Sequence, residues 1–248
     1  MTSPIGSEKS LAIILAAGLG TRMRSATAKV LHPLCGRPMV GWVARAAREA
    51  GCSVAAVVHH QEDRVRAALP GVPCARQDQP RGTGDAVRSA AHLLPDLGTV
   101  VVLPGDAPLI RPAMLRALLE GHGDALCTVL STVVPQPGAY GRIVRQGGRV
   151  VGIVEASEAT PAQLAITEVN AGIYAFEAAW LRDLVLPSLQ PHPPKGEYYI
   201  TDVPGIMLGQ GLTVEALPVL QPCESLSVNT PAQLADVEQE MRRLSMAP

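Results

Sequence analysis

The run at residues 11–17, LAIILAA, is the feature that most narrows the folds open to this chain. Seven consecutive apolar residues are typical of a strand buried on both faces, as in a parallel sheet that helices cover on two sides. Further, largely apolar runs follow at 53–59, 99–103 and 125–134, and helical patterns lie between the runs at 38–50, 62–69, 84–94 and 112–120. This alternation predicts a parallel, doubly wound α/β sheet.

The pattern changes after Pro135. Residues 142–145 and 149–155 predict a hairpin around the turn at 146–148, and 168–176 predict a further strand. Helices are expected at 177–189, 197–208 and 232–244, with a late strand at 213–217; Pro204 should kink the second helix or shift its start. We predict one continuous domain whose middle third forms a small β lobe that faces the substrate.

Composition excludes several classes of protein. A hydrophobic fraction of 47% fits a folded core, and a formal net charge of −1 argues against a strongly basic nucleic-acid-binding surface. The five cysteines are odd in number, widely spaced and without a CxxC pair, which argues against a disulfide framework or a zinc site. Residues 1–10 hold no long apolar run, so we expect a soluble, cytoplasmic protein without a membrane partner.

A glycine loop follows the first expected strand, in LAAGLGTR at 15–22. Backbone N–H groups in such a loop can approach phosphate oxygens closely. Arg22 adds a planar cation and Lys29 a mobile one. The loop lacks the third glycine of the dinucleotide fingerprint and the GK[ST] of a P-loop. A plain tight turn would explain the glycines alone, but the two cations favour phosphate binding.

Two more motifs follow later strands. In QDQPRGTG at 77–84, the amide of Gln77 can read the edge of a base, and Gly82 and Thr83 open a helix with free N–H groups. In LPGDAPL at 103–109, Asp106 lies just past a buried strand, where α/β sheets bind ligands, and one carboxylate is a typical Mg²⁺ ligand. A capped helix start and a capped turn are the structural alternatives.

Some residues have simpler interpretations. His59 and His60 end an apolar strand without acidic or thiol partners at ligand spacing, so we interpret them as core or rim residues rather than metal ligands. The charged segment 236–243 is interpreted as a solvated helix face, with a partner-docking helix as the alternative.

Nine segments together resemble the uridylyltransferase half of the bacterial bifunctional enzymes that make UDP-N-acetylglucosamine. They are LAAGLGTRM, AKVLHPLCGRPM, QPRGTGDA, LPGDAPLI, AYGRIVR, IVEASEAT, EVNAGIYAF, KGEYYITDV and SVNTPAQL, in family order from residue 11 to about residue 234. The opening motif is shared by many sugar nucleotidyltransferases, whereas the combination of AKVLH, GTG, YGRI, EVNAG and GEYYITD is much more specific to this branch.

The resemblance implies a Rossmann-like nucleotidyltransferase fold, a mostly parallel sheet with helices on both faces and a small substrate-facing β lobe. It implies transfer of UMP from UTP to N-acetylglucosamine 1-phosphate with Mg²⁺ as cofactor, in a domain spanning 1–230 followed by a linker-like C-terminal helix at 231–248. No nucleic-acid partner is expected, and the oligomeric state stays open.

The resemblance also implies roles for individual residues. Uracil and ribose contacts would come from Leu15, Ala16, Ala17, Gly18, Gln77, Gly82 and Thr83. Arg22 and Lys29 match catalytic, phosphate-binding cations, and Asp106 and Asn229 match the Mg²⁺ ligands, with Gly105 in the substrate site beside them. Gly141, Glu155 and Asn170 match positions that hold the N-acetylglucosamine moiety, and Tyr198 and Thr201 match a segment that lines the sugar site.

Two departures and several alternatives accompany the resemblance. Leu19 occupies a loop position that is often polar or basic in the family, so one phosphate contact is missing. The family's second half, a left-handed β-helix of hexapeptide repeats, has no counterpart in the given sequence, which is either a fragment or a single-function protein. Acetyl transfer and trimer formation are therefore not carried over from the family. The alternatives are another substrate pair (glucose 1-phosphate with UTP or dTTP, or an alcohol phosphate with CTP), a non-catalytic nucleotide-sugar sensor, and a scaffold protein. The full charge set of Arg22, Lys29, Asp106 and Asn229 speaks against a mere binder.

Overall fold

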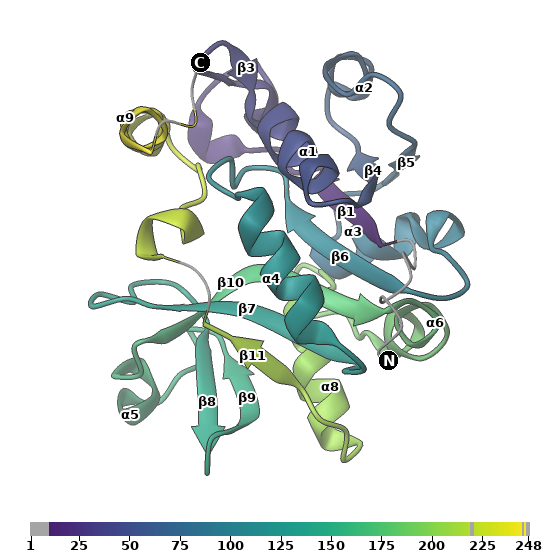
Figure 1. Ribbon diagram of the computed structural model, residues 1–248, viewed down its shortest axis with the longest axis vertical. Helices are drawn as coiled ribbons and strands as arrows, with labels where there is room; N and C mark the ends of the chain where they lie inside the picture. Colours follow the sequence, from purple (N-terminus) through teal and green to yellow (C-terminus); the bar gives the residue numbers. More distant parts are fainter. Residues whose placement is uncertain (1–9, 219–220, 245, 247–248) are drawn as a thin grey trace, which may run out of the picture.

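The computed structural model describes residues 10–218, 221–244 and 246. A nine-stranded sheet runs through it in the order β11-β7-β10-β6-β1-β4-β5, and the hairpin β8–β9 joins through β10 (Figure 1). The strands are β1 (Leu11–Ala16), β4 (Ser53–Val58), β5 (Cys74–Arg76), β6 (Thr99–Pro104), β7 (Cys127–Val133), β8 (Arg142–Gln146), β9 (Arg149–Val154), β10 (Glu168–Glu177) and β11 (Glu215–Leu217). A separate short ribbon pairs β2 (Pro33–Leu34) with β3 (Arg37–Pro38).

The sheet is mostly parallel, with one reversed strand in its middle. β1 pairs in parallel with β4 and β6, whereas β10 pairs antiparallel with both β6 and β7. The reversal follows from the connection, because the chain comes back from the β8–β9 lobe into β10 without the long crossover that a parallel neighbour needs. The expectation of a mostly parallel, Rossmann-like sheet is confirmed, and β10 is its reversed strand.

Helices cover both faces of the sheet. They are α1 (Met39–Glu49), α2 (Glu62–Ala68), α3 (Thr83–Ser89), α4 (Pro112–His122), α5 (Pro161–Leu164), α6 (Ala178–Trp180), α7 (Leu186–Ser188), α8 (Val203–Gly209) and α9 (Pro231–Arg243). Successive residues of a strand point to opposite faces. Accordingly Ile14 of β1 packs in a cluster with α1 and α4, and Ile13 packs in a second cluster with α3 and α8.

Proline decides where α8 begins. The sequence pattern suggested a helix from residue 197, but the structure has a 3₁₀ turn at Ile200–Asp202 and an α-helix from Val203, with Pro204 in its first turn. Proline is tolerated there because its missing N–H has no intrahelical partner at that position. The predicted shift of the start is confirmed.

Helix α9 closes one side of the molecule. Its Val237 and Met241 are buried in a third cluster with Met23, Met39 and Trp42 of the N-terminal half. Its charged residues pair along the helix, as in the bond of Arg242 to Glu238 at 2.9 Å. The helix thus has an apolar face docked on the domain and a charged face in solvent.

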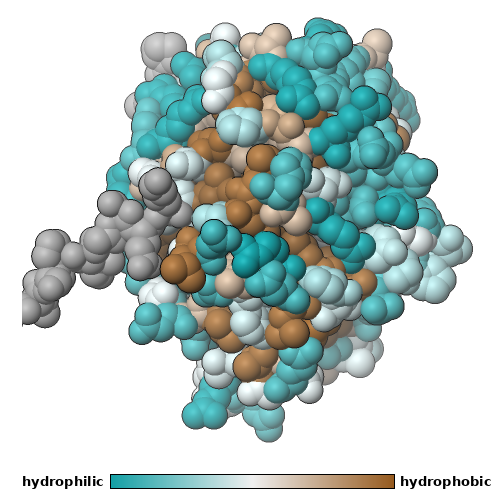
Figure 2. Space-filling model, turned by 90° about the vertical axis from the view of Figure 1, so that its right-hand side faces the viewer, coloured by the Kyte–Doolittle hydropathy of each residue, from teal (hydrophilic) through white to brown (hydrophobic). Residues whose placement is uncertain are grey.

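The surface combines polar and apolar regions. On the side drawn in Figure 2, hydrophilic side chains cover most of the right-hand part, and hydrophobic ones gather in a band down the middle. Within the ranges described, no helix has the length and apolar character that crossing a membrane requires.

Candidate active site

A cavity of about 540 Å³ lies at the carboxyl ends of β1 and β6, where Leu15 and Pro104 are register partners. Ligands of open α/β sheets bind at this edge, because the loops that follow the strands meet there. The lining consists of Leu15, Ala17, Gly18, Leu19, Gly20, Thr21, Lys29, Val30, Gln77, Pro80, Gly82, Thr83, Ala86, Pro104, Asp106, Lys195 and Glu197. The cavity therefore joins the glycine loop, the GTG turn and the loop after β6.

The glycine loop brings a lysine into this cavity. Gly20 has φ +62°, and a Cβ placed on it would lie 2.5 Å from the Cβ of Lys29. Glycine is required at this position both for the left-handed backbone and for the passage of the Lys29 side chain. A 3₁₀ turn, Thr21–Met23, follows and exposes Arg22.

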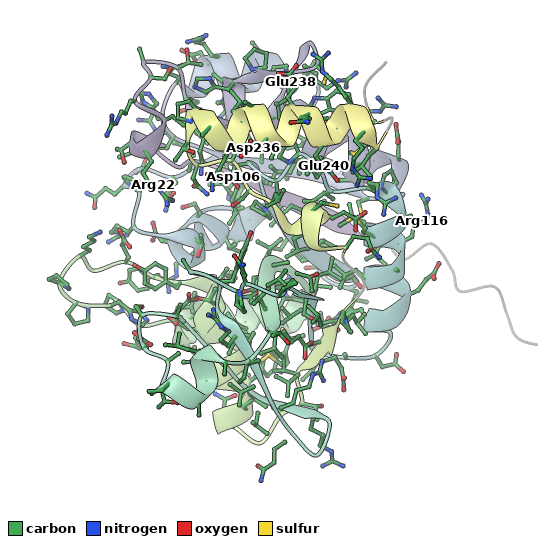
Figure 3. The ribbon with its side chains drawn as sticks, turned by 90° about the vertical axis from the view of Figure 1, so that its left-hand side faces the viewer. Arg22, Asp106, Arg116, Asp236, Glu238 and Glu240 are labelled. Atoms are coloured by element: carbon green, nitrogen blue, oxygen red, sulfur yellow. The ribbon has the colours of Figure 1, made fainter. Side chains whose placement is uncertain are left out.

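Four charged or polar side chains meet at the edge of the cavity. The ammonium of Lys29 contacts the Asp106 carboxylate and also donates to Asn229 Oδ1 at 2.9 Å. Arg22 Nη2 donates to the same Asn229 oxygen at 2.9 Å. Figure 3 shows Arg22 and Asp106 near the beginning of α9, whereas Arg116 of α4 lies near the opposite end of that helix. Residues 207 positions apart in the sequence, Arg22 and Asn229, are thus neighbours in space.

The backbone and a serine set the position of Asn229. Val228 N donates to Asp106 O at 2.9 Å, which ties the segment before α9 to the loop after β6. Asn229 N donates to Gln233 Oε1 at 2.9 Å, and Asn229 Nδ2 donates to Ser227 Oγ at 3.2 Å. Because its amide nitrogen is bonded to Ser227, the side chain turns its oxygen toward Lys29 and Arg22.

The donor set fits a hard divalent cation. The Lys29 ammonium bonds to both Asp106 Oδ2 and Asn229 Oδ1, so these two oxygens face a common point that already holds positive charge. Carboxylate and amide oxygens suit Mg²⁺, whose remaining positions are commonly filled by phosphates and water. In the described residues no group of three or more His, Cys, Asp or Glu side chains could hold a metal by itself.

The GTG turn is held against the 198–200 segment. Gly82 has φ +90°, and a Cβ there would collide with the carbonyl oxygen of Tyr198. Gly84 N donates to Tyr198 O, and Tyr198 N donates to Arg81 O, both at 2.8 Å. Thr83 Oγ1 accepts a bond from Ile200 N at 3.0 Å. Gly82 and Thr83 thus line the cavity and at the same time fix its wall.

Gln77 is 2% exposed and lies on this wall. Its Nε2 donates to Asp85 Oδ2 at 2.9 Å and to Gly82 O at 3.2 Å. Its backbone carbonyl contacts His59 Nδ1 at 2.8 Å. The donor end of the amide is therefore committed inside the protein, and Oε1 is left for a ligand N–H.

Other residues of the expected nucleotide site act through their backbone. Ala16 and Ala17 are buried in the two opposite core clusters. Gly105 N donates to Leu15 O at 3.0 Å, and a Cβ on Gly105 would lie 2.7 Å from that oxygen. Ala16 and Gly105 are not part of the cavity lining; Gly105 holds the loop after β6 against β1.

The expected sugar-binding residues form a second group. Asn170 N donates to Gly141 O at 2.9 Å. Gly141 lies beside the Glu155 carboxylate, since a Cβ built on Gly141 would be 3.5 Å from Glu155 Oε1. Burial raises the pKa of Glu155, and the hydrogen bond with Thr201 partly opposes that rise. Asn170 is itself engaged, since its Nδ2 donates to Tyr174 OH at 2.6 Å. These residues, with Arg22 and Asn229, do not line the 540 Å³ cavity.

Tyr198 has a mainly structural environment. Its ring packs beside the cluster of α3 and α8, and the guanidinium of Arg88 lies 4.5 Å from the ring centroid. Three nearby residues, Lys195, Glu197 and Ser227, were not predicted as site residues, although they lie in the segments KGEYYITDV and SVNTPAQL. The available signal was the pair of charges in KGE, directly before the tyrosines.

Comparison with known proteins places the chain in a family. Residues 12–161 match the model of the MobA-like NTP transferase domain. The chain is 49% identical to the bifunctional protein GlmU of Geobacter metallireducens over 233 residues, which cover 91% of this chain and 49% of that protein. It is 49% identical to the bifunctional protein GlmU of Kineococcus radiotolerans over 243 residues (94% of this chain, 49% of that protein) and 42% identical to that of Solibacter usitatus over 238 residues (93% and 51%).

The chain spans about half the length of these curated relatives. The matched family range covers the glycine loop, Lys29, Gln77 and Asp106, all of which line the cavity. Because the family model matches more than half of the chain and the fold has the expected mostly parallel sheet, the chain belongs to the MobA-like NTP transferase domain family.

Proposed function

We propose that this protein transfers UMP from UTP to N-acetylglucosamine 1-phosphate, giving UDP-N-acetylglucosamine and pyrophosphate. The observation that carries the proposal is the meeting of Arg22, Lys29, Asp106 and Asn229 beside a glycine-loop cavity. The nine matched segments and the similarity to the GlmU proteins support the choice of substrates.

The environment of Gln77 supports a uracil base. Its Nε2 is bonded to Asp85 and Gly82, so the group it offers to a ligand is the acceptor Oε1. Uracil presents an N3–H donor to such an acceptor, whereas cytosine has an unprotonated N3 at the same place. With cytosine, two acceptors, Gln77 Oε1 and the base N3, would face each other without a hydrogen bond. Leaving such buried groups unsatisfied costs about 1–3 kcal/mol. Leu15 and the backbone at 17–18, which line the cavity, would pack against the base and ribose.

The chemistry needs no general base. The sugar phosphate is already an anion near neutral pH, and one of its oxygens would attack the α-phosphorus in line while pyrophosphate leaves. The barrier comes from repulsion between anions and from charge that grows on the leaving group, so positioning and electrostatics supply the catalysis. Arg22 and Lys29 would stabilise the triphosphate and the departing pyrophosphate.

A divalent metal belongs to this scheme, and we propose Mg²⁺. Asp106 and Asn229 would hold it, since their oxygens already converge on the Lys29 ammonium. Bound there, it would neutralise phosphate charge. Lys29 would then turn its ammonium from these oxygens toward the phosphates.

The acceptor sugar would bind at the second group of residues. Gly141 leaves space beside the Glu155 carboxylate, and Thr201 bonds to that carboxylate. The hydroxyl and N-acetyl groups of the sugar would pair with Glu155, Asn170 and Thr201, with Tyr198 beside them. We further propose that residues 1–230 form the nucleotidyltransferase domain, that the segment 231–248 follows it with helix α9 docked on that domain, and that the protein acts in the cytoplasm. Residues 1–9, 219–220, 245 and 247–248 of these ranges lie outside the described residues.

The test is pyrophosphate release from a panel of substrate pairs, with Mg²⁺ and with EDTA. UTP with N-acetylglucosamine 1-phosphate should give the highest kcat/KM, above glucose 1-phosphate with UTP or dTTP. A stronger response to another pair would overturn the substrate assignment and keep the reaction class. Binding of UDP-N-acetylglucosamine without turnover of any pair would point to the sensor alternative.

A further inference from the structure

The turn at 192–197 carries a lysine to the wall of the nucleotide cavity. His192 N donates to Glu197 O and Gly196 N donates to His192 O, both at 2.8 Å, so the chain reverses tightly. Gly196 has φ +66°, a left-handed conformation that favours glycine. Lys195 lies in this turn and lines the cavity together with Gly18, Leu19 and Lys29.

Contacts at the base of the turn fix its position. His192 Nε2 pairs with Asp202 Oδ2 at 2.8 Å, and the His192 and Tyr199 rings lie with their centroids 5.0 Å apart. The Tyr199 hydroxyl donates to the Glu197 carboxylate. Because the backbone is anchored by these side chains, the fold itself sets the place of Lys195 beside the cavity.

Lys195 has no ion-pair partner among the described residues. The lining holds two cations, Lys29 and Lys195, and two anions, Asp106 and Glu197. Lys29 is paired with Asp106, and Glu197 accepts the bond from Tyr199. Across the residues that the structure describes, no hydrogen bond or ion pair includes the Lys195 ammonium, and its side chain is exposed.

Lysine is much rarer than arginine in this chain. The sequence holds three lysines against eighteen arginines, and both lysines in the part of the chain that the structure describes line this one cavity. The glycine loop itself contributes no cation to the lining: it places Leu19 there, 48% exposed. A triphosphate brings several negative charges into the cavity, and a mobile ammonium is suited to phosphate oxygens.

We propose that Lys195 binds the phosphates of the nucleoside triphosphate and supplies the cation that the glycine loop lacks at Leu19. This inference rests on the proposed function, because its ligand is the UTP of that same site. The phosphates are charged before and during the reaction, so Lys195 contributes similarly to the ground state and the transition state.

The main experiment compares Lys195→Ala and Lys195→Arg with the wild-type protein. Loss of one charge-assisted hydrogen bond to phosphate should raise the KM for UTP about tenfold in the alanine variant. The arginine variant should keep a KM within about twofold of wild type, because it retains the charge. The kcat and the KM for N-acetylglucosamine 1-phosphate should change less than about twofold in both.

The matched control is Arg149→Ala. Arg149 is an exposed cation at the start of β9, beside the hairpin turn, and should leave every kinetic parameter unchanged. All variants should keep the wild-type Tm, which separates a phosphate contact from a structural role. Adding Leu19→Lys to the alanine variant should lower the raised KM for UTP again, since both positions line the same cavity. A wild-type KM for UTP in Lys195→Ala, or equal KM values in the alanine and arginine variants, overturns the proposal.

Calorimetric titration with UTP and Mg²⁺ separates this proposal from the function. Binding that is about tenfold weaker in Lys195→Ala than in wild type supports the proposal even if the sugar phosphate is not turned over. Equal UTP affinities in the two proteins overturn the role of Lys195 and leave the function standing. A wild-type protein that binds no UTP overturns both.

Discussion

Replacing Arg22 by alanine should slow the reaction greatly and leave the fold intact. In the structure the Arg22 guanidinium is exposed, and the bond it donates is to Asn229 Oδ1 at 2.9 Å. Exposed polar contacts of this kind contribute about 0–1 kcal/mol to stability. For a domain of this length, 1 kcal/mol corresponds to a Tm change of about 2–4 °C. The Tm of Arg22→Ala should therefore lie within about 4 °C of the wild-type Tm.

The expected effect on the rate is much larger. Removing one preorganised group that stabilises developing charge costs about 10²–10³ in kcat, or about 2.7–4 kcal/mol. The KM for UTP should rise far less than kcat falls, because the charge on the leaving pyrophosphate grows in the transition state. Arg22→Lys should keep part of the activity, since it retains the charge and loses the planar fork.

The assay is steady-state pyrophosphate release by the two variants, with Tm measured in parallel. A kcat of Arg22→Ala within about threefold of wild type would refute the assigned role. A large loss of rate accompanied by a drop in Tm well beyond the expected range would show instead that Arg22 acts through the fold.

Three further outcomes are expected. Asp106→Ala should abolish metal-dependent turnover, while a variant that keeps full activity with Mg²⁺ would remove Asp106 from the metal site. Gly82→Ala should lower Tm and weaken UTP binding, because its Cβ would collide with Tyr198 O and its φ of +90° strains an L-residue by about 1–3 kcal/mol; an unchanged Tm and UTP affinity would contradict this reason. Burial raises the pKa of Glu168, but bonds from Arg145 and Ser131 outweigh it and hold the pKa below its ordinary value. The resulting stabilisation is present above the unfolded pKa of about 4.3 and is lost as the pH falls through the lower folded pKa. The free energy of unfolding, measured by urea titration, should therefore fall less between pH 7 and pH 3 in Glu168→Gln than in wild type. An equal fall in the two proteins would contradict this assignment.

Much of the fold follows from local patterns. The buried runs became β1, β4, β6 and β7, and the helix expected at 38–50 became α1, ending just before Gly51. Hydropathy does not encode the direction of a strand, so the reversal of β10 was not predicted. Its direction depends on how the chain leaves the β8–β9 lobe, which is a property of the connection.

Less of the candidate site than of the fold could be predicted from local patterns. Motifs located the glycine loop and Asp106, but the approach of Arg22 to Asn229 joins residues 207 positions apart and came only through the family resemblance. The commitment of the Gln77 amide nitrogen to Asp85 depends on tertiary packing, and so does the place of Lys195 on the cavity wall. No spacing rule within one segment contains these contacts.

The central claim is tested most directly by identifying the product. The protein would be incubated with UTP, N-acetylglucosamine 1-phosphate and Mg²⁺, and the nucleotide products would be separated and quantified by liquid chromatography with mass detection. The account predicts UDP-N-acetylglucosamine and pyrophosphate in equal amounts, and neither product when EDTA is present. Pyrophosphate without a nucleotide sugar, or no product at all with intact protein and saturating substrates, would contradict it.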